Sequence, residues 1–260
     1  MSINNKTRLI ISVSSNPTNF GTTIYNYIFD QLNLNFIYLP FRLTDSQQVV
    51  SVIKTLDLVG CSVSSPLKSQ VVKYMDDLDL NAQILNNINT IKNIDGKLKG
   101  YNTDYFGFKS IVDNKNVKSA LIYGNGSVAK TIYQVLIDIG VNNIYITGRN
   151  IDNVVKFKKD LHNSKIYENQ KVDLIVNATK AGTLKEGEIF EYINYSDKLI
   201  DLNVCKKDTY LVSSALSLGI EVIKGSEMSI NQLKKQFEIY TEMVPDEELL
   251  SRGLEKFFKS

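Results

Sequence analysis

Cysteine, histidine and tryptophan are scarce in this chain of 260 residues, which has 2 Cys, 1 His and no Trp. Cys61 and Cys205 lie far apart in the sequence, and neither belongs to a CxxC pair. A disulfide framework and a cysteine-based metal site are therefore not expected. His162 is the single histidine, which leaves too few ligands for a zinc site. The sequence predicts no metal.

Long apolar runs and runs of like charge are also missing. Residues 1–8 are polar, and the apolar run after them is too short for a signal peptide or a membrane-spanning helix. The 30 basic and 28 acidic residues are dispersed and give a net charge of +2, so neither nucleic acid nor a membrane is an expected partner. We expect a cytoplasmic protein, monomeric or homodimeric, that binds a small molecule.

The hydrophobic pattern is that of an α/β protein with two domains. Short apolar runs alternate with longer amphipathic stretches, as in successive βα units. In the first part we expect a mixed sheet, with strands at 9–13, 36–39 and 58–63 and helices at 22–34, 46–56 and 68–76. From residue 116 the alternation is stricter and predicts a Rossmann-like half, with strands at 119–123, 144–147, 172–177 and 199–202 and helices at 127–139 and 154–161. Two closing helices are expected at 226–240 and 246–258, with Ser226 and Asp246 as N-caps.

A glycine-rich turn follows the expected strand at 119–123. It reads Gly124-Asn125-Gly126-Ser127-Val128-Ala129, a GxGxxA pattern that closes a strand and opens a helix. The first glycine permits a tight turn, the second lets the backbone approach a pyrophosphate, and the alanine allows close helix packing. The helix N-terminus supplies N–H donors to the phosphates. The pattern predicts a dinucleotide site, and an ordinary βα turn is the alternative.

The end of the next strand favours NADP over NAD. Thr147-Gly148-Arg149-Asn150 stand where an NAD site normally has an acidic residue on the ribose hydroxyls. The Arg149 guanidinium could instead bind a 2′-phosphate. Alternatively, Arg149 is a solvated loop cation.

Three polar motifs precede the glycine-rich turn: Gly60-Cys61-Ser62-Val63-Ser64-Ser65-Pro66-Leu67-Lys68, Asn87-Ile88-Asn89-Thr90, and Gly100-Tyr101-Asn102-Thr103-Asp104-Tyr105-Phe106-Gly107. In this order they resemble the motifs GxNVTxPxK, AVNT and GxNTDxxG of the shikimate dehydrogenase family. The resemblance continues with Gly148-Arg149-Asn150 for the family's NRT or NRS, Asn177-Ala178-Thr179-Lys180-Ala181-Gly182 for NATPxG, and Gly225, Met228 and Gln232 for GxxMLxxQ. It covers nearly the whole chain.

The resemblance implies an NADP-dependent oxidoreductase that interconverts shikimate and 3-dehydroshikimate, on the route to chorismate and the aromatic amino acids. Residues 1–105 and 237–260 would bind a polyhydroxy ring carboxylate, and residues 106–236 would bind NADP, with the reaction between the two domains. By the resemblance, Lys68 and Asp104 are the catalytic pair and Asn89 and Gln232 the substrate-binding amides, while Ser64 keeps the hydroxyl of a family threonine. Asn177, Ala178, Thr179, Gly225 and Met228 would lie at the cofactor.

The chemistry of such a reaction also points to Lys68. Oxidation of a hydroxyl needs a group that takes its proton, and these motifs contain no histidine, so lysine is the remaining candidate. Lys68 and Asp104 could also share the proton transfer. The alternatives are structural: Lys68 as a surface cation after a proline turn, and Asp104 as the N-cap of a helix over 105–112.

The N-terminal segment departs from the family. Members carry SxSPxxHN, whose serines bind the substrate carboxylate, whereas this chain has Asn19-Phe20-Gly21-Thr22-Thr23-Ile24-Tyr25-Asn26. The variant is similar to the shikimate-dehydrogenase-like branch. Asn19, Thr22 and Thr23 are the candidate replacements, although Thr22 fits a helix N-cap equally well. The family's YxP is absent near 204–206, and Thr183 stands where a methionine is usual. A quinate or other shikimate-analogue dehydrogenase therefore remains an alternative, as does a catalytically inactive NADP(H)-binding regulator.

Overall fold

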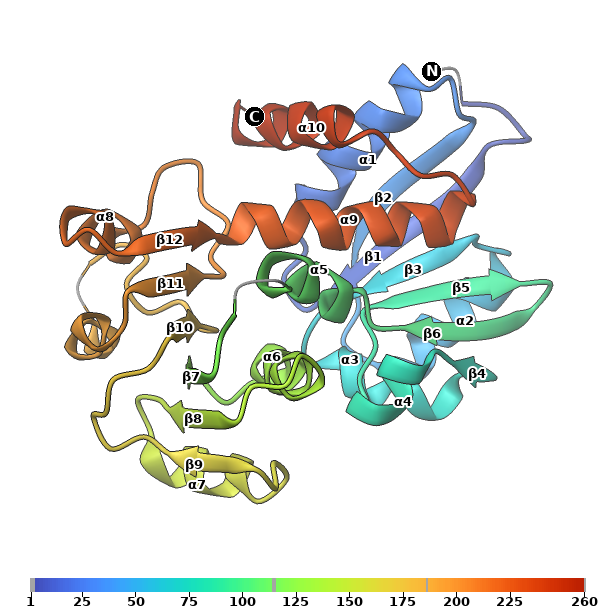
Figure 1. Cartoon of the computed structure of the whole chain (residues 1–260). Helices are drawn as coiled ribbons and strands as arrows, with labels where there is room; N and C mark the ends of the chain where they lie inside the picture. The colour runs from blue at the N-terminus through green and yellow to red at the C-terminus, as the bar shows by residue number, and fades with distance from the viewer. Residues whose placement is uncertain (1–2, 114–115, 186, 260) are drawn as a thin grey trace. The chain divides into compact units, whose positions relative to one another are not determined.

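The computed structural model describes residues 3–113, 116–185 and 187–259. The chain divides into two compact units, Met1–Phe106 with Gln232–Ser260, and Gly107–Asn231 (Figure 1). Each crossing between the units lies inside a helix, the first in α5 (Thr103–Val112) and the second in α9 (Gly225–Thr241). Residues 232–236, which we expected in the nucleotide half, lie with the first unit.

The first unit contains a mixed sheet in the order β2-β1-β3-β5-β6-β4. Strands β1 (Arg8–Ser14), β2 (Phe36–Arg42) and β3 (Gly60–Val63) are parallel, whereas β5 (Thr90–Ile94) runs antiparallel to β3 and to β6 (Lys97–Tyr101). The short β4 (Asp77–Leu78) pairs in parallel with β6. Because of these directions, β1, β3 and β6 end at the same edge at which β5 begins. We call it the polar edge.

The helices of the first unit are α1 (Phe20–Gln31), α2 (Ser46–Thr55), α3 (Leu67–Gln70), α4 (Leu80–Leu85) and α10 (Glu247–Lys259), together with the C-terminal part of α9. The core that contains residues of α2, α3 and α4 is aliphatic, whereas α1 and α9 pack through aromatic rings. Tyr25 and Phe29 of α1 lie within 6.1 and 5.6 Å of the Phe237 ring of α9, centroid to centroid. The helix expected over 68–76 is wrong in extent, because the Asp76 N–H pairs with the Leu98 carbonyl beside β6 and the chain is extended there.

The second unit is a parallel sheet in the order β12-β11-β10-β7-β8-β9 (Figure 1). Its strands are β7 (Ser119–Tyr123), β8 (Asn143–Thr147), β9 (Ser164–Ile166), β10 (Leu174–Asn177), β11 (Lys198–Asp201) and β12 (Glu221–Lys224), and its helices are α6 (Ser127–Asp138), α7 (Ile151–Lys158) and α8 (Tyr210–Ser217). Read from β7 outward, this is the doubly wound dinucleotide-binding order, with a topological switch point between β7 and β10. The α/β prediction with a Rossmann-like half is confirmed.

One of the two predicted N-caps of the closing helices is confirmed. Asp246 precedes α10 and accepts a hydrogen bond from the Glu248 N–H at 3.0 Å. Ser226 is wrong as a cap, because α9 already begins at Gly225, directly after β12. A Cβ on Gly225 would come within 2.5 Å of the Leu202 carbonyl, so the close approach of these two backbones requires glycine at the first residue of α9. No helix in the described ranges is long and apolar enough to cross a membrane.

Candidate functional site

Three predicted site residues meet at the polar edge of the first unit. The Lys68 Nζ donates to Asp104 Oδ2 at 2.5 Å, and the Asn89 Nδ2 donates to Asp104 Oδ1 at 2.8 Å. Both oxygens of the Asp104 carboxylate are therefore held. The Lys68 and Asp104 side chains are each 13% exposed, so the pair is shielded yet open to a ligand. A lysine ammonium has three N–H donors, and the described contacts use one of them, which leaves donors for a substrate hydroxyl.

The orientation of the Asn89 amide is fixed by its neighbours. Its Oδ1 accepts from the Thr103 N–H at 2.9 Å, from the Thr103 hydroxyl at 3.0 Å and from the Thr90 hydroxyl at 3.0 Å. Three donors on one atom identify that atom as oxygen, so the Nδ2 must face Asp104. The Asn89 side chain is buried, with 5% of the residue exposed, so loss of its hydrogen bonds would leave buried polar atoms unpaired and would destabilise the fold.

Two glutamines of α9 complete the network. The Gln232 Nε2 donates to the Thr103 hydroxyl at 2.9 Å, and the Gln236 Nε2 donates to the Thr90 hydroxyl at 2.7 Å. Each hydroxyl therefore receives one hydrogen bond and passes one to Asn89. The glutamine amides donate to the threonine hydroxyls, the hydroxyls donate to Asn89, and Asn89 donates to Asp104. This chain of hydrogen bonds orients the Asp104 carboxylate before a substrate binds.

The local sequence explains how Lys68 and Asp104 reach this edge. Lys68 lies in the short helix α3 behind the cis peptide Ser65–Pro66, and buried Leu67 anchors the turn. Asp104 lies in the first turn of α5, whose Tyr105 N–H donates to Asn102 Oδ1 at 3.1 Å. Asn102 thus caps α5, and the alternative that Asp104 is the N-cap is wrong, because the helix starts at Thr103, two residues earlier than that alternative required.

The remaining predicted substrate residues lie near the start of α1 and after β3. Asn19 is exposed at the N-cap position of α1, and Ser64 is exposed beyond β3. Thr22 is wrong as an N-cap, because α1 already begins at Phe20. The Thr22 hydroxyl is buried and, within the described part of the chain, has no hydrogen-bond partner; Thr23 is half-buried.

No role was predicted for Thr90, Thr103 or Gln236, although Gln236 is also part of the family resemblance. Both threonines stood inside motifs that we singled out, next to residues that were assigned roles. The i, i+4 spacing of Gln232 and Gln236 on one helix face was the available signal for the second glutamine.

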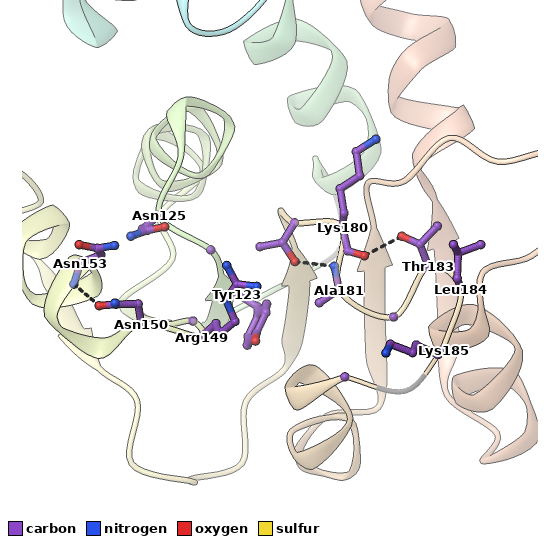
Figure 2. A pocket seen from close by; sticks show the side chains of 15 residues that line it. Tyr123, Asn125, Arg149, Asn150, Asn153, Lys180, Ala181, Thr183, Leu184 and Lys185 are labelled. Carbon is purple, nitrogen blue, oxygen red and sulfur yellow. Dashed lines mark hydrogen bonds between the residues drawn. The ribbon is translucent and has the colours of Figure 1, made fainter. Parts of the chain in front are cut away.

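The second unit carries a pocket of about 890 Å³ at the carboxyl ends of β7, β8 and β10 (Figure 2). This is the switch-point location at which doubly wound sheets bind ligands. Of the predicted cofactor residues, those that line it are Gly124, Asn125, Gly148, Arg149 and Thr179. Thr183, which stands where the family usually has a methionine, also lines it, as do residues to which no cofactor role was assigned, including Tyr123, Asn150, Asn153, Lys180, Leu184 and Lys185.

The glycine-rich turn fits a dinucleotide. Gly124 has a φ of +129°, and a Cβ there would come within 2.8 Å of Thr179 Cγ2, so the turn needs glycine for its own packing. A Cβ on Gly126, by contrast, would meet nothing within 4 Å. The space in front of Gly126 is therefore open to a ligand that approaches the backbone. Ser127, Val128 and the fully buried Ala129 form the first turn of α6 behind it.

Other predicted cofactor residues hold the loops around the pocket. Asn177 is fully buried and its Nδ2 donates to the Ala181 carbonyl at 2.9 Å, so its amide serves the loop after β10. Thr147 is buried at the end of β8, and its carbonyl accepts from the Gly124 N–H at 2.8 Å. Ala178 stays half-buried behind Gly124, while Gly225 and the buried Met228 begin α9.

No group of three or more metal-ligating side chains occurs among the residues that the structure describes. The polar edge of the first unit carries the Lys68–Asp104 pair, and the described lining of the pocket in the second unit carries Arg149, Lys180 and Lys185.

Comparison with known proteins gives a consistent result. The family model of the shikimate dehydrogenase substrate-binding domain matches residues 17–91. The shikimate dehydrogenase-like protein of Haemophilus influenzae is 31% identical over 96% of this chain and 97% of its own length. The NADP(+) shikimate dehydrogenase of Methanocaldococcus jannaschii is 30% identical over 97% and 98%.

Two solved structures superpose on nearly the whole of this chain. A shikimate 5-dehydrogenase-like protein superposes with a TM-score of 0.88 at 31% identity and covers 100% of both chains. The Listeria monocytogenes shikimate 5-dehydrogenase, solved in complex with shikimate and NAD, superposes with a TM-score of 0.84 at 25% identity over 97% of this chain and 98% of its own. On the extent of these matches and the order of its motifs, the chain belongs to the shikimate dehydrogenase family.

Proposed function

We propose that this protein is an NADP-dependent dehydrogenase that interconverts shikimate and 3-dehydroshikimate. The observation that carries the proposal is the Lys68–Asp104–Asn89 arrangement at the polar edge, in a chain whose relatives are named NADP(+) shikimate dehydrogenases. We place the enzyme in the cytoplasm, as a monomer or a homodimer.

The first unit supplies the proton chemistry. Oxidation of a ring hydroxyl removes a hydride from carbon and a proton from oxygen, and bound NADP supplies the hydride acceptor. In the oxidation, the neutral Lys68 amine accepts the hydroxyl proton as the hydride leaves the carbon and becomes an ammonium, which Asp104 orients through the 2.5 Å contact. Asn89 keeps the second Asp104 oxygen occupied, so the carboxylate presents a single geometry to Lys68.

Gln232, Ser64, Asn19, Thr22 and Thr23 are proposed to bind the ring substituents. Gln232 and Thr103 join at 2.9 Å beside the catalytic pair, so the glutamine amide can contact a substrate hydroxyl next to the one that reacts. The buried Thr22 hydroxyl has an unused donor and acceptor among the described contacts. These groups position the ring and leave the proton transfer to Lys68.

The second unit is proposed to hold NADP, with the pyrophosphate over Gly124 to Ala129 and the 2′-phosphate at Arg149. Two observations support this assignment: the space in front of Gly126 is open, and Arg149 lies on the pocket lining at the end of β8. Helix α6 begins at Ser127, so the positive end of its dipole would face the pyrophosphate.

Arg149→Ala should weaken NADP⁺ binding about tenfold and leave NAD⁺ binding within twofold, because only NADP carries the 2′-phosphate that a guanidinium would grip. Titration calorimetry with both dinucleotides measures the two dissociation constants. An equal loss for both would contradict the assignment of Arg149 to the 2′-phosphate.

The proposed activity is tested by initial rates of absorbance change at 340 nm with NADP⁺ or NAD⁺ and shikimate or quinate. Reduction of NADP⁺ with shikimate is the expected result. NADP⁺ binding without turnover of either acid would overturn the proposal.

A second candidate is a dehydrogenase of quinate or another shikimate analogue. The observation that favours it is the segment from Asn19 to Thr23, where the two carboxylate-binding serines of the family are replaced. A higher kcat/KM for quinate than for shikimate in the same assay would select this candidate.

A further inference from the structure

The pocket of the second unit contains two lysines to which the motifs assigned no role. Lys180 and Lys185 lie on the segment that follows β10, whereas Arg149 follows β8 (Figure 2). Lys180 occupies the position at which the family motif NATPxG has proline. A proline cannot carry charge, so this chain gains a cation at a position where the motif has none.

The charged residues among the described lining of the pocket are all cationic. They are Arg149, Lys180 and Lys185, and no aspartate or glutamate is found among the described residues that line it. Three cations on one pocket wall favour a ligand with several negative charges. NADP carries them in two places, the pyrophosphate and the 2′-phosphate.

The backbone at Lys180 is held in place by its neighbours. The Thr179 hydroxyl donates to Asn177 Oδ1 at 2.8 Å and accepts from the Ala181 N–H at 3.0 Å. The Lys180 carbonyl accepts from the Thr183 hydroxyl at 2.8 Å (Figure 2). The exposed Lys180 side chain thus starts from a fixed point on the pocket wall, which lowers the entropy lost when it binds a phosphate.

Strand order indicates which phosphate the lysines face. In the sheet, β7 lies between β8 and β10, so the glycine-rich turn after β7 lies between Arg149 and the segment after β10. In doubly wound folds the pyrophosphate sits at this turn and the adenosine ribose at the next strand, here β8. The segment after β10 closes the opposite side of the pyrophosphate position, and Thr179 already packs on Gly124.

We propose that Lys180 and Lys185 bind the pyrophosphate of the dinucleotide, separately from the 2′-phosphate contact of Arg149. The inference rests on the proposed function. It predicts a signature that Arg149 cannot produce: loss of either lysine weakens NADP⁺ and NAD⁺ alike, because both dinucleotides contain the pyrophosphate.

The test is calorimetric binding of NADP⁺ and NAD⁺ to Lys180→Ala, Lys185→Ala and the double variant. The double variant is expected to raise both dissociation constants on the order of tenfold, with their ratio unchanged within twofold. The affinity of the wild type should fall more steeply with added NaCl than that of the double variant, because the double variant lacks the two lysine–phosphate contacts that salt screens. Lys180→Arg should retain most of the affinity.

Lys171→Ala is the matched control. Lys171 is an exposed lysine of the same unit that lies just before β10, at the opposite edge of the sheet, so its removal changes net charge without touching the pocket. Its binding constants should equal those of the wild type.

Other outcomes overturn the inference in distinguishable ways. If the wild type binds both dinucleotides and the double variant binds them equally well, the lysine assignment is wrong and the proposed function stands. If only NADP⁺ binding falls, the lysines serve the 2′-phosphate instead. If the wild type binds neither dinucleotide, the proposed function and the inference fail together.

Discussion

Lys68→Met is expected to lower kcat for shikimate oxidation about 10³-fold, within the range that a positioned proton-transfer group contributes. Methionine keeps the length of the side chain and removes the ammonium that contacts Asp104. Because the pocket proposed to bind NADP is lined by residues of the second unit, the dissociation constant for NADP⁺ should stay within twofold of the wild type. Initial rates at 340 nm and calorimetry measure the two quantities.

Two further variants make the Lys68 experiment decisive. Lys68→Arg keeps the positive charge beside Asp104 but carries a guanidinium that does not release its proton, so it should be nearly as inactive as Lys68→Met. Lys73→Met removes an exposed lysine a few residues further along the same segment and should retain wild-type rates. A Lys68→Arg enzyme with more than a tenth of wild-type kcat would show that Lys68 supplies charge and not proton transfer.

Gly60→Ala is expected to destabilise the protein by about 3 kcal/mol or more, beyond the usual cost of an overpacked core. Gly60 begins β3, and a Cβ there would come within 2.3 Å of the Ile91 carbonyl oxygen and 2.6 Å of the Tyr240 ring. Neither neighbour can move freely, since Ile91 belongs to the paired strand β5 and Tyr240 is buried. Urea denaturation followed by circular dichroism measures the change.

Gly126→Ala is the matched control for the Gly60 variant. The added Cβ would meet nothing within 4 Å, so the urea midpoint should match that of the wild type. Equal midpoints for Gly60→Ala and the wild type would mean that β3 and β5 can separate at no cost, contrary to the packing described above.

The central strands β7 and β10 of the second unit were predictable because they are buried on both faces, whereas the edge strands β9 and β12 are partly exposed and were not expected. Residues 120–123 and 174–177 are all buried, and such strands read as continuous apolar runs. The hairpin of β5 and β6 in the first unit escaped prediction. Its strand β5 contains Lys92, which reads as a surface residue but is 8% exposed and donates to the Tyr240 carbonyl at 2.8 Å. Tyr240 lies 148 residues from Lys92 in the sequence, so the local sequence around Lys92 does not predict that its side chain is buried.

The candidate site divides in the same way. Lys68, Asn89 and Asp104 stand in ordered motifs, so the resemblance implied their roles, and the role of Lys68 could also be argued from the absence of histidine in those motifs. The contact of Gln236 with Thr90 spans 146 residues and exists only once α9 packs against β5. Whether Thr22 caps a helix depended on where α1 begins, and a difference of two residues decided against it.

The two crossings between the units run through α5 and α9, and this affects how the protein can be cut. Domains are usually joined by exposed, flexible linkers that proteases cleave and that tolerate truncation. Here a fragment spanning residues 107–231 would start inside one helix and end inside another, with backbone groups at both cuts stripped of their helical partners. Limited proteolysis should therefore fail to release the second unit at these boundaries, and neither half is a natural module for transplantation into another protein.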